Sequence, residues 1–137
     1  GDDTGGIYSG SNLTVVRNSV IWGNTSNAAT TSESQIHHSS STLPLVRYST
    51  VEGDLFSGQG NQNTDPLFVN GDPGQGPVDL RLGAGSPCID TGSTSLLLPD
   101  EADLDNDGNL GEPTPLDLDG LPRVVGTAVD RGAYETP

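Results

Sequence analysis

VRNSVIWGN, residues 16–24, recurs 30 residues later as VRYSTVEGD, residues 46–54. Valine, arginine, serine and glycine return at the same places, and Asn24 is matched by the chemically similar Asp54. Repeats of about 20–50 residues are typical of stacked units that bury a core only against their neighbours. Aligned positions of the two copies are therefore expected to lie side by side.

The segments inside each copy are predicted to be β-strands. Residues 13–16 and 20–22 are short, rich in β-branched side chains, and bounded by Gly, Asn and Ser. No window of eleven residues carries a clear apolar stripe with helical spacing. Coils of a parallel β-helix fit the fixed offset best, because the alternative, an antiparallel sandwich, has no reason to repeat.

The sequence pattern of the chain changes near Asn61. Residues 1–60 are predicted to form β-helix coils, and residues 61–137 to add C-terminal coils and an acidic, calcium-binding cap of the same domain. The second segment lacks the earlier period and contains long Gly-, Pro- and Asp-rich stretches. A cap of this kind is expected, because an open coil end exposes strand edges and apolar core.

Four short motifs occur in order from residue 65 onward: DPLF (65–68), LRL (80–82) with GSPCIDTG (85–92), DLDGLPR (117–123) and VDRGAYE (129–135). Upstream of them lie two further segments, GGIY (5–8) and NSVIWGN (18–24). This series resembles bacterial surface proteins with a choice-of-anchor Q domain, which are related to the polymorphic outer-membrane protein repeats. The resemblance covers nearly the whole chain.

The resemblance implies a right-handed parallel β-helix on a secreted or surface-anchored bacterial protein, with an irregular, loop-rich C-terminal cap. It implies no established enzyme activity. Two positions depart from the family pattern: Cys88 stands where alanine is common, and Arg131 where a small or apolar residue is common. Neither departure affects the expected fold.

The run DLDNDGN, residues 103–109, indicates a cation site. Carboxylates at every second position followed by glycine open a calcium loop, where hard oxygen ligands surround the ion and glycine permits a sharp turn. In a helix-loop-helix calcium site the twelfth residue is a bidentate Glu, but here it is Thr114, flanked by prolines. A calcium loop without helices is therefore predicted, with a solvated acidic turn as the alternative.

The candidate calcium ligands lie between residues 103 and 117. Three carboxylates are expected to supply side-chain oxygens and one asparagine a main-chain carbonyl, while either of two further acids could complete the shell. The full set is Asp103, Asp105, Asp107, Asn109, Glu112 and Asp117. Three carboxylates within five residues repel one another, and a bound cation removes that repulsion.

The charge balance restricts the partners. Nineteen acidic residues face five arginines and no lysine, which gives a net charge of −14. Phosphate binding needs a basic surface, so nucleic acid is excluded as a partner, and membrane insertion of this segment is not expected either. The expected partner is a glycan or protein surface, or another copy of the chain that stacks end to end.

Three functions are compatible with these observations. The first is a non-enzymatic, extracellular structural or adhesive protein on the bacterial cell surface; the others are a self-assembling fibre subunit and a polysaccharide-acting lyase or hydrolase. No nucleophile, base and orienting residue occur in a recognisable motif, so an enzyme is not expected. Asn12 and Asn24 match the glycosylation pattern, and the single Cys88 is predicted to be a buried, unreactive side chain.

Overall fold

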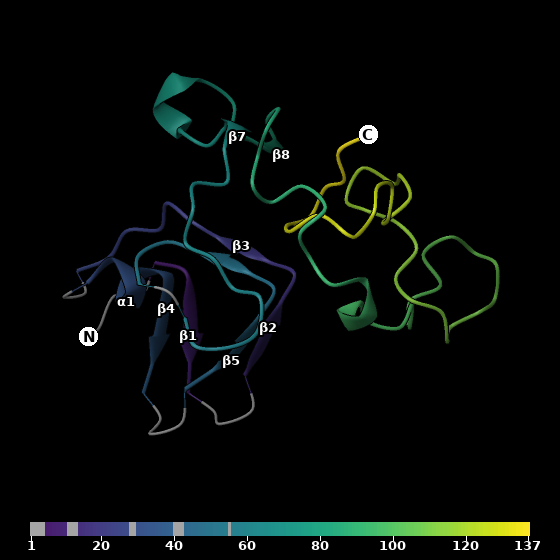
Figure 1. The fold of residues 1–137 in the computed structure, drawn as a ribbon, viewed down its shortest axis with the longest axis horizontal. Helices are drawn as coiled ribbons and strands as arrows, with labels where there is room; N and C mark the ends of the chain where they lie inside the picture. Colours follow the sequence, from purple (N-terminus) through teal and green to yellow (C-terminus); the bar gives the residue numbers. More distant parts are fainter. Residues whose placement is uncertain (1–4, 11–13, 28–29, 40–42, 55) are drawn as a thin grey trace. The chain divides into compact units, whose positions relative to one another are not determined.

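The computed structural model divides the chain into two compact units, Gly1–Pro66 (unit 1) and Leu67–Pro137 (unit 2). The structure describes residues 5–10, 14–27, 30–39, 43–54 and 56–137. Unit 1 carries most of the strands, whereas the green-to-yellow part of unit 2 consists mainly of loops (Figure 1). The boundary lies close to Asn61, where the repeated pattern ends.

Unit 1 contains short strands that form parallel pairs. They are β1 (Ile7–Ser9), β2 (Val15–Arg17), β3 (Val20–Ile21), β4 (Ile36–His38), β5 (Leu45–Arg47) and β6 (Thr50–Val51). β1 pairs with β4, β2 with β5 and β3 with β6 (Figure 1). Val16 lies opposite Val46, so the residues aligned by the 30-residue offset are neighbours, as expected.

The predicted right-handed parallel β-helix is nevertheless wrong. Among the described residues each sheet has two strands, and none continues as a solenoid or closes. In a solenoid each inner coil pairs with a coil on either side, whereas two copies of a repeat provide only one pairing. The described residues that directly follow β6 add an isolated parallel bridge between Thr50 and Gln62 in place of a further strand, because the Gly- and Asn-rich residues 57–64 contain no β-branched run.

The core of unit 1 comes from one face of these strands. The buried apolar side chains are Val16, Ile21, Ile36, Val46 and Val51, with Ile7 and Phe56 packed against them. In β5 the central valine is buried while its two neighbours are exposed, which is the alternation that a strand imposes. The parallel register therefore stacks the apolar positions of both copies on each other.

Equivalent turns separate the strands of the two copies. Asn18 and Tyr48 occupy the same place and both adopt a left-handed backbone, with φ of 49° and 47°. In the turn after β5, the Ser49 hydroxyl donates to the carbonyl of Arg47 at 2.9 Å. Asparagine tolerates this conformation readily, whereas tyrosine adopts it at a cost that the surrounding pairing must offset.

The short helix α1 (Thr31–Gln35) lies outside the sequence-based expectations. Its N-cap is Thr30, whose Oγ1 accepts from the Glu33 N–H at 3.2 Å and donates to the Glu33 carboxylate at 3.1 Å. Threonine followed three residues later by glutamate is a known start signal. A helix of this length has no room for an apolar stripe, which is why periodicity did not indicate it.

Unit 2 begins with an antiparallel pair. β7 (Phe68–Asn70) and β8 (Asp79–Leu82) flank the 3-10 helix η1 (Pro73–Gln75), and a second 3-10 helix, η2, covers Thr94–Leu96. The antiparallel direction is a further departure from the predicted coils. Among the described residues of this unit, the buried apolar side chains are Leu82, Cys88 and Val129. The prediction that Cys88 is buried is confirmed.

A polar network replaces a large apolar core in unit 2. The Arg123 guanidinium pairs with the buried Glu135 carboxylate and donates to the Gly132 carbonyl at 2.8 Å. The same carboxylate accepts from the Asp130 N–H at 3.0 Å. The Glu135 N–H donates in turn to Asp117 at 3.0 Å. Residues 117–135 are thereby held by charge-assisted bonds, which are stronger than neutral ones.

Candidate functional site

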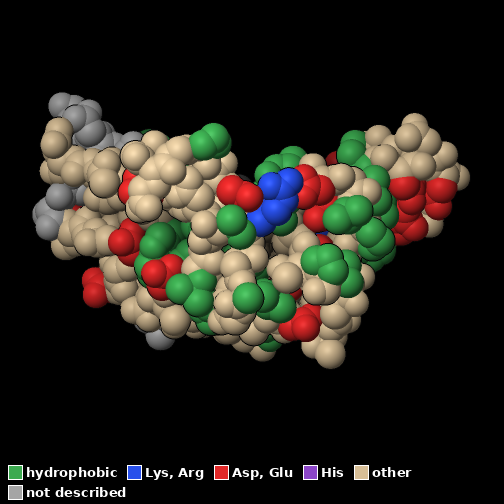
Figure 2. All heavy atoms as spheres, turned by 90° about the horizontal axis from the view of Figure 1, so that it is seen from above, with side chains coloured by type: hydrophobic (Ala, Val, Ile, Leu, Met, Phe, Trp, Pro, Cys, Tyr) green, Lys and Arg blue, Asp and Glu red, His purple; other side chains and the backbone are tan. Residues whose placement is uncertain are grey.

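The acidic segment of unit 2 forms a loop closed at its base. We call residues 100–112 the acidic loop. The Asp100 N–H donates to the Glu112 carbonyl and the Thr114 N–H to the Leu98 carbonyl, both at 2.8 Å, and Pro99 bridges Pro113 in antiparallel fashion. In Figure 2, red Asp and Glu side chains gather at the right-hand end, which the green loop of this segment occupies in Figure 1.

Three positions in the acidic loop have a left-handed backbone. They are Asp103 (φ 52°), Asn106 (φ 61°) and Gly108 (φ 85°). Glycine adopts this conformation without strain, and Asp and Asn tolerate it better than other residues. The prediction that Gly108 permits a sharp turn therefore agrees with the observed backbone. These reversals fold the segment back on itself, so that alternate carboxylates point toward a common region.

The predicted ligands Asp103, Asp105 and Asp107 come together, and we call them the outer trio. One oxygen from each lies within 4.8 Å of the others. Each carboxylate also accepts a backbone N–H: Asp103 from Gly108 at 3.0 Å, Asp105 from Asp107 at 3.3 Å, and Asp107 from Asn109 at 2.7 Å. Such local bonds orient the carboxylates before any cation arrives.

A second group, which we call the inner trio, consists of Asp100, Asp105 and Glu112. Its oxygens also lie within 4.8 Å of one another, and Asp105 belongs to both groups. Burial raises the pKa of Glu112, and the charges of Asp107, Asp105 and Asp100 raise it further. Glu112 was among the predicted ligands, but Asp100 was not, because it precedes the alternating motif.

The remaining predicted ligands have other partners. The Asn109 amide donates to Glu112 at 3.4 Å and its oxygen accepts from the Gly111 N–H at 3.3 Å. Asp117 belongs to neither trio, within the part of the chain that the structure describes. Its carboxylate accepts the N–H groups of Asp119, Leu121 and Glu135 at 2.9–3.0 Å.

The surroundings of Asp117 explain why its carboxylate bonds to groups outside the acidic loop. Burial alone raises the pKa of its carboxyl group, but the backbone N–H groups of Glu135, Leu121 and Asp119 outweigh burial and lower the pKa below its ordinary value. The neighbouring Arg123 charge acts in the same direction. Asp117 thus stabilises the turn into residues 117–121 as an ionised acceptor.

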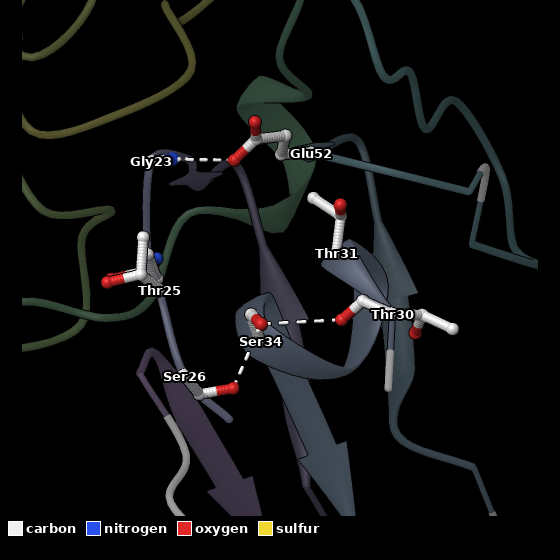
Figure 3. Close-up of a pocket in the computed structure, with 8 residues that line it drawn as sticks. Gly23, Thr25, Ser26, Thr30, Thr31, Ser34 and Glu52 are labelled. Carbon is white, nitrogen blue, oxygen red and sulfur yellow. Dashed lines mark hydrogen bonds between the residues drawn. The ribbon is translucent and has the colours of Figure 1, made fainter. Parts of the chain in front are cut away.

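Unit 1 contains a polar pocket of about 400 Å³. It is lined by Gly23, Asn24, Thr25, Ser26, Thr30, Thr31, Ser34 and Glu52. Figure 3 shows Glu52 accepting from the Gly23 N–H, at 2.8 Å, and Ser26 facing Ser34, at 2.9 Å. These polar groups already bond to one another, and no aromatic ring, which sugars commonly stack on, is among the lining residues.

Other sequence-based expectations concern single residues. The Asn24 amide donates to Gln35 at 2.7 Å, while Asn12 lies outside the described residues. Asp119, next to the predicted ligand Asp117, forms a two-point ion pair with Arg81, with both distances 2.9 Å. Asp119 therefore faces a guanidinium rather than the acidic loop.

Comparisons with known proteins yield no relative for this chain. No family model, no curated protein and no solved structure matches it significantly. Within the residues that the structure describes, no helix is long and apolar enough to span a bilayer. The acidic loop is thus interpreted from its own geometry.

Proposed function

We propose that the chain is a non-enzymatic structural or adhesive module of an extracellular protein, and that calcium fixes its acidic loop. The observation that carries the proposal is the outer trio, whose oxygens converge within 4.8 Å at positions set by backbone hydrogen bonds. Calcium binds six to eight oxygens in flexible arrangements, so carboxylates on an irregular loop suit it.

Electrostatics favours a divalent ion in this loop. Like charges at such separations repel one another even near a protein surface, and a cation turns that repulsion into attraction. The net charge of −14 adds a long-range attraction for cations. Magnesium suits the loop less well, because it requires a smaller octahedral shell and loses its water reluctantly.

The extracellular location rests on composition and on the family resemblance. Extracellular modules bind calcium with dissociation constants of about 10⁻⁴–10⁻³ M, a range that a partly exposed loop can reach. The order of the four C-terminal motifs resembles proteins of the bacterial surface, for which a structural or adhesive role is expected. A glycan or protein surface remains the proposed partner.

Thermal unfolding in calcium and in chelator tests the proposal. We expect calcium to raise the melting temperature, because an ion that binds only the folded loop stabilises it by mass action. Asp105→Asn removes a carboxylate shared by both trios and is expected to abolish most of this gain. Asp54→Asn makes the same charge change on an exposed residue of unit 1 and is the matched control.

Two results would count against calcium binding. Identical melting curves in excess calcium and excess chelator would reject the site altogether. An equal gain with magnesium would show that the loop responds to divalent charge in general rather than to calcium.

A further inference from the structure

Asp100 is a buried carboxylate with an unused acceptor. Asp100 is 2% exposed, and its Oδ2 accepts from the Leu104 N–H at 2.8 Å. Among the described residues, no donor is within hydrogen-bonding distance of Asp100 Oδ1. Buried polar atoms are nearly always paired, so an orphaned carboxylate oxygen needs an explanation.

Glu112 repeats this pattern beside Asp100. Its Oε1 is also buried and has no donor among the described residues, while its Oε2 accepts one long bond from Asn109 at 3.4 Å. Both residues with an orphaned oxygen therefore belong to one group with Asp105, in which one oxygen of each of the three residues lies within 4.8 Å of the others. Carboxylates in such a position attract a cation rather than a further anion or an apolar group.

The closure of the acidic loop brings the two residues together. Pro99 and Pro113 form an antiparallel bridge, and the Asp100 N–H donates to the Glu112 carbonyl. Residues that face each other across an antiparallel pair project side chains to the same side. Asp100 and Glu112 are thus neighbours because of the bridge, although eleven residues separate them.

We propose that the acidic loop holds a calcium ion at the inner trio, with Asp100 as a buried ligand and Asp105 as the link to the outer trio. The inference deepens the proposed function, because it specifies which oxygens bind the ion. Asp100 and Glu112 supply the two orphaned oxygens, and Asp105 supplies a third from the turn. Oxygen ligands and net negative charge select a hard cation over a soft one.

Calorimetric titration of the full 137-residue chain with calcium chloride tests this assignment. Asp100→Asn and Glu112→Gln are expected to weaken calcium binding at least about tenfold, because ligand charge sets the affinity of such sites. Glu101→Gln is the matched control, since Glu101 is exposed, lies in the same loop and belongs to neither trio. It is expected to bind calcium as the unaltered chain does.

The calcium-free proteins give a second readout. Removing one negative charge from the inner trio relieves repulsion, so Glu112→Gln should melt at the same or a higher temperature in chelator, yet gain less from calcium. A merely structural role for Glu112 would instead lower the melting temperature in both conditions. Glu112→Gln also keeps the test decisive if Asp100→Asn fails to fold.

The double variant Asp103→Asn, Asp107→Asn separates this inference from the proposed function. We call Asp100→Asn and Glu112→Gln the inner variants and the double variant the outer variant. Weaker calcium binding by both inner variants, with binding by Glu101→Gln unchanged, supports the inner site whatever the outer variant does. Normal binding in both inner variants together with loss in the outer variant would overturn the inner site and leave the calcium-stabilised loop intact. Absence of calcium binding by the unaltered chain would overturn both.

Discussion

Units 1 and 2 reach an ordered structure by opposite means. Unit 1 stacks two copies of one short motif, so that five apolar side chains gather between parallel pairs. Unit 2 buries few apolar side chains and instead buries charged ones, namely Asp100, Asp117, Arg123, Asp130, Arg131 and Glu135. The first arrangement depends on apolar burial, and the second on bonds between side chains and backbone.

The difference shows where a cation can act. An apolar core offers no site for an ion, whereas a unit held by carboxylates and backbone N–H groups can leave some oxygens without donors. In unit 2 the network around Glu135 satisfies its acids with an arginine and N–H groups, while the acidic loop leaves Asp100 and Glu112 oxygens without donors. We therefore expect the acidic loop to respond to cations, and unit 1 not to.

The largest expected effect is Arg123→Met. Arg123 and Glu135 are both buried, and loss of one partner of a buried ion pair typically costs about 3–5 kcal/mol. We expect urea unfolding at pH 8 to show this loss, with faster hydrogen exchange across residues 117–135. Arg47→Met makes the same change on an exposed residue of unit 1 and should alter stability by less than about 0.5 kcal/mol. Equal losses for both variants would contradict the polar character of unit 2.

Ile36→Ala tests the apolar character of unit 1. Ile36 is fully buried in β4, and replacing a core isoleucine by alanine costs about 2–5 kcal/mol. A small core can partly collapse around the gap, so a value toward the lower end is expected. Trp22, the single tryptophan, lies in unit 1 and reports its unfolding by fluorescence. A change confined to hydrogen exchange in unit 2 would contradict the assignment of Ile36 to this core.

The pH dependence of unit 2 should follow Glu135 and, in the same direction, Glu112, whose pKa is also raised. Burial raises the pKa of Glu135 to about 7, against the opposing effects of the Asp130 N–H and the Arg123 charge. Between pH 4.5 and about 7, Glu135 keeps its proton in the folded unit, whereas in the unfolded chain, where its pKa is 4.5, it has released the proton. The contribution of Glu135 to the stability of unit 2 is therefore fully present below pH 4.5 and is lost as the pH rises through about 7.

Hydrogen exchange of unit 2 in chelator measures this pH effect. The lowered pKa of Asp117 acts only below its ordinary value of 3.8, outside this window. Glu135→Gln is expected to flatten the profile, and an unchanged slope would show that another group is responsible.

The smallest expected effect is Asp119→Asn. Its ion pair with Arg81 has good two-point geometry, but the Arg81 side chain is about half exposed. Exposed pairs contribute little and are screened by salt. The urea midpoint should shift barely beyond experimental error at low salt, and less still at about 0.5 M NaCl, where salt screens exposed charges more strongly. A large shift would mean that surface pairs help to hold unit 2.

The repeat and the start signal of α1 predicted local pairing and local structure to different extents. The 30-residue offset placed Val16 beside Val46 correctly, because equal motifs present equal strands and turns. It did not determine how many strands a sheet would contain, and the predicted β-helix failed at that point. The start of α1 was readable from Thr30 and Glu33, but a helix this short leaves no periodic signal.

The sequence by itself determined what depends on near neighbours. Carboxylates at Asp103, Asp105 and Asp107 converge because alternate positions around a glycine turn lie close together whatever surrounds them. Only the tertiary structure decided that Asp100 meets Glu112, that Arg123 meets Glu135, and that Asp117 turns away from the acidic loop. These meetings depend on which distant backbone segments pair, and loop closure of that kind leaves no mark in local spacing or composition.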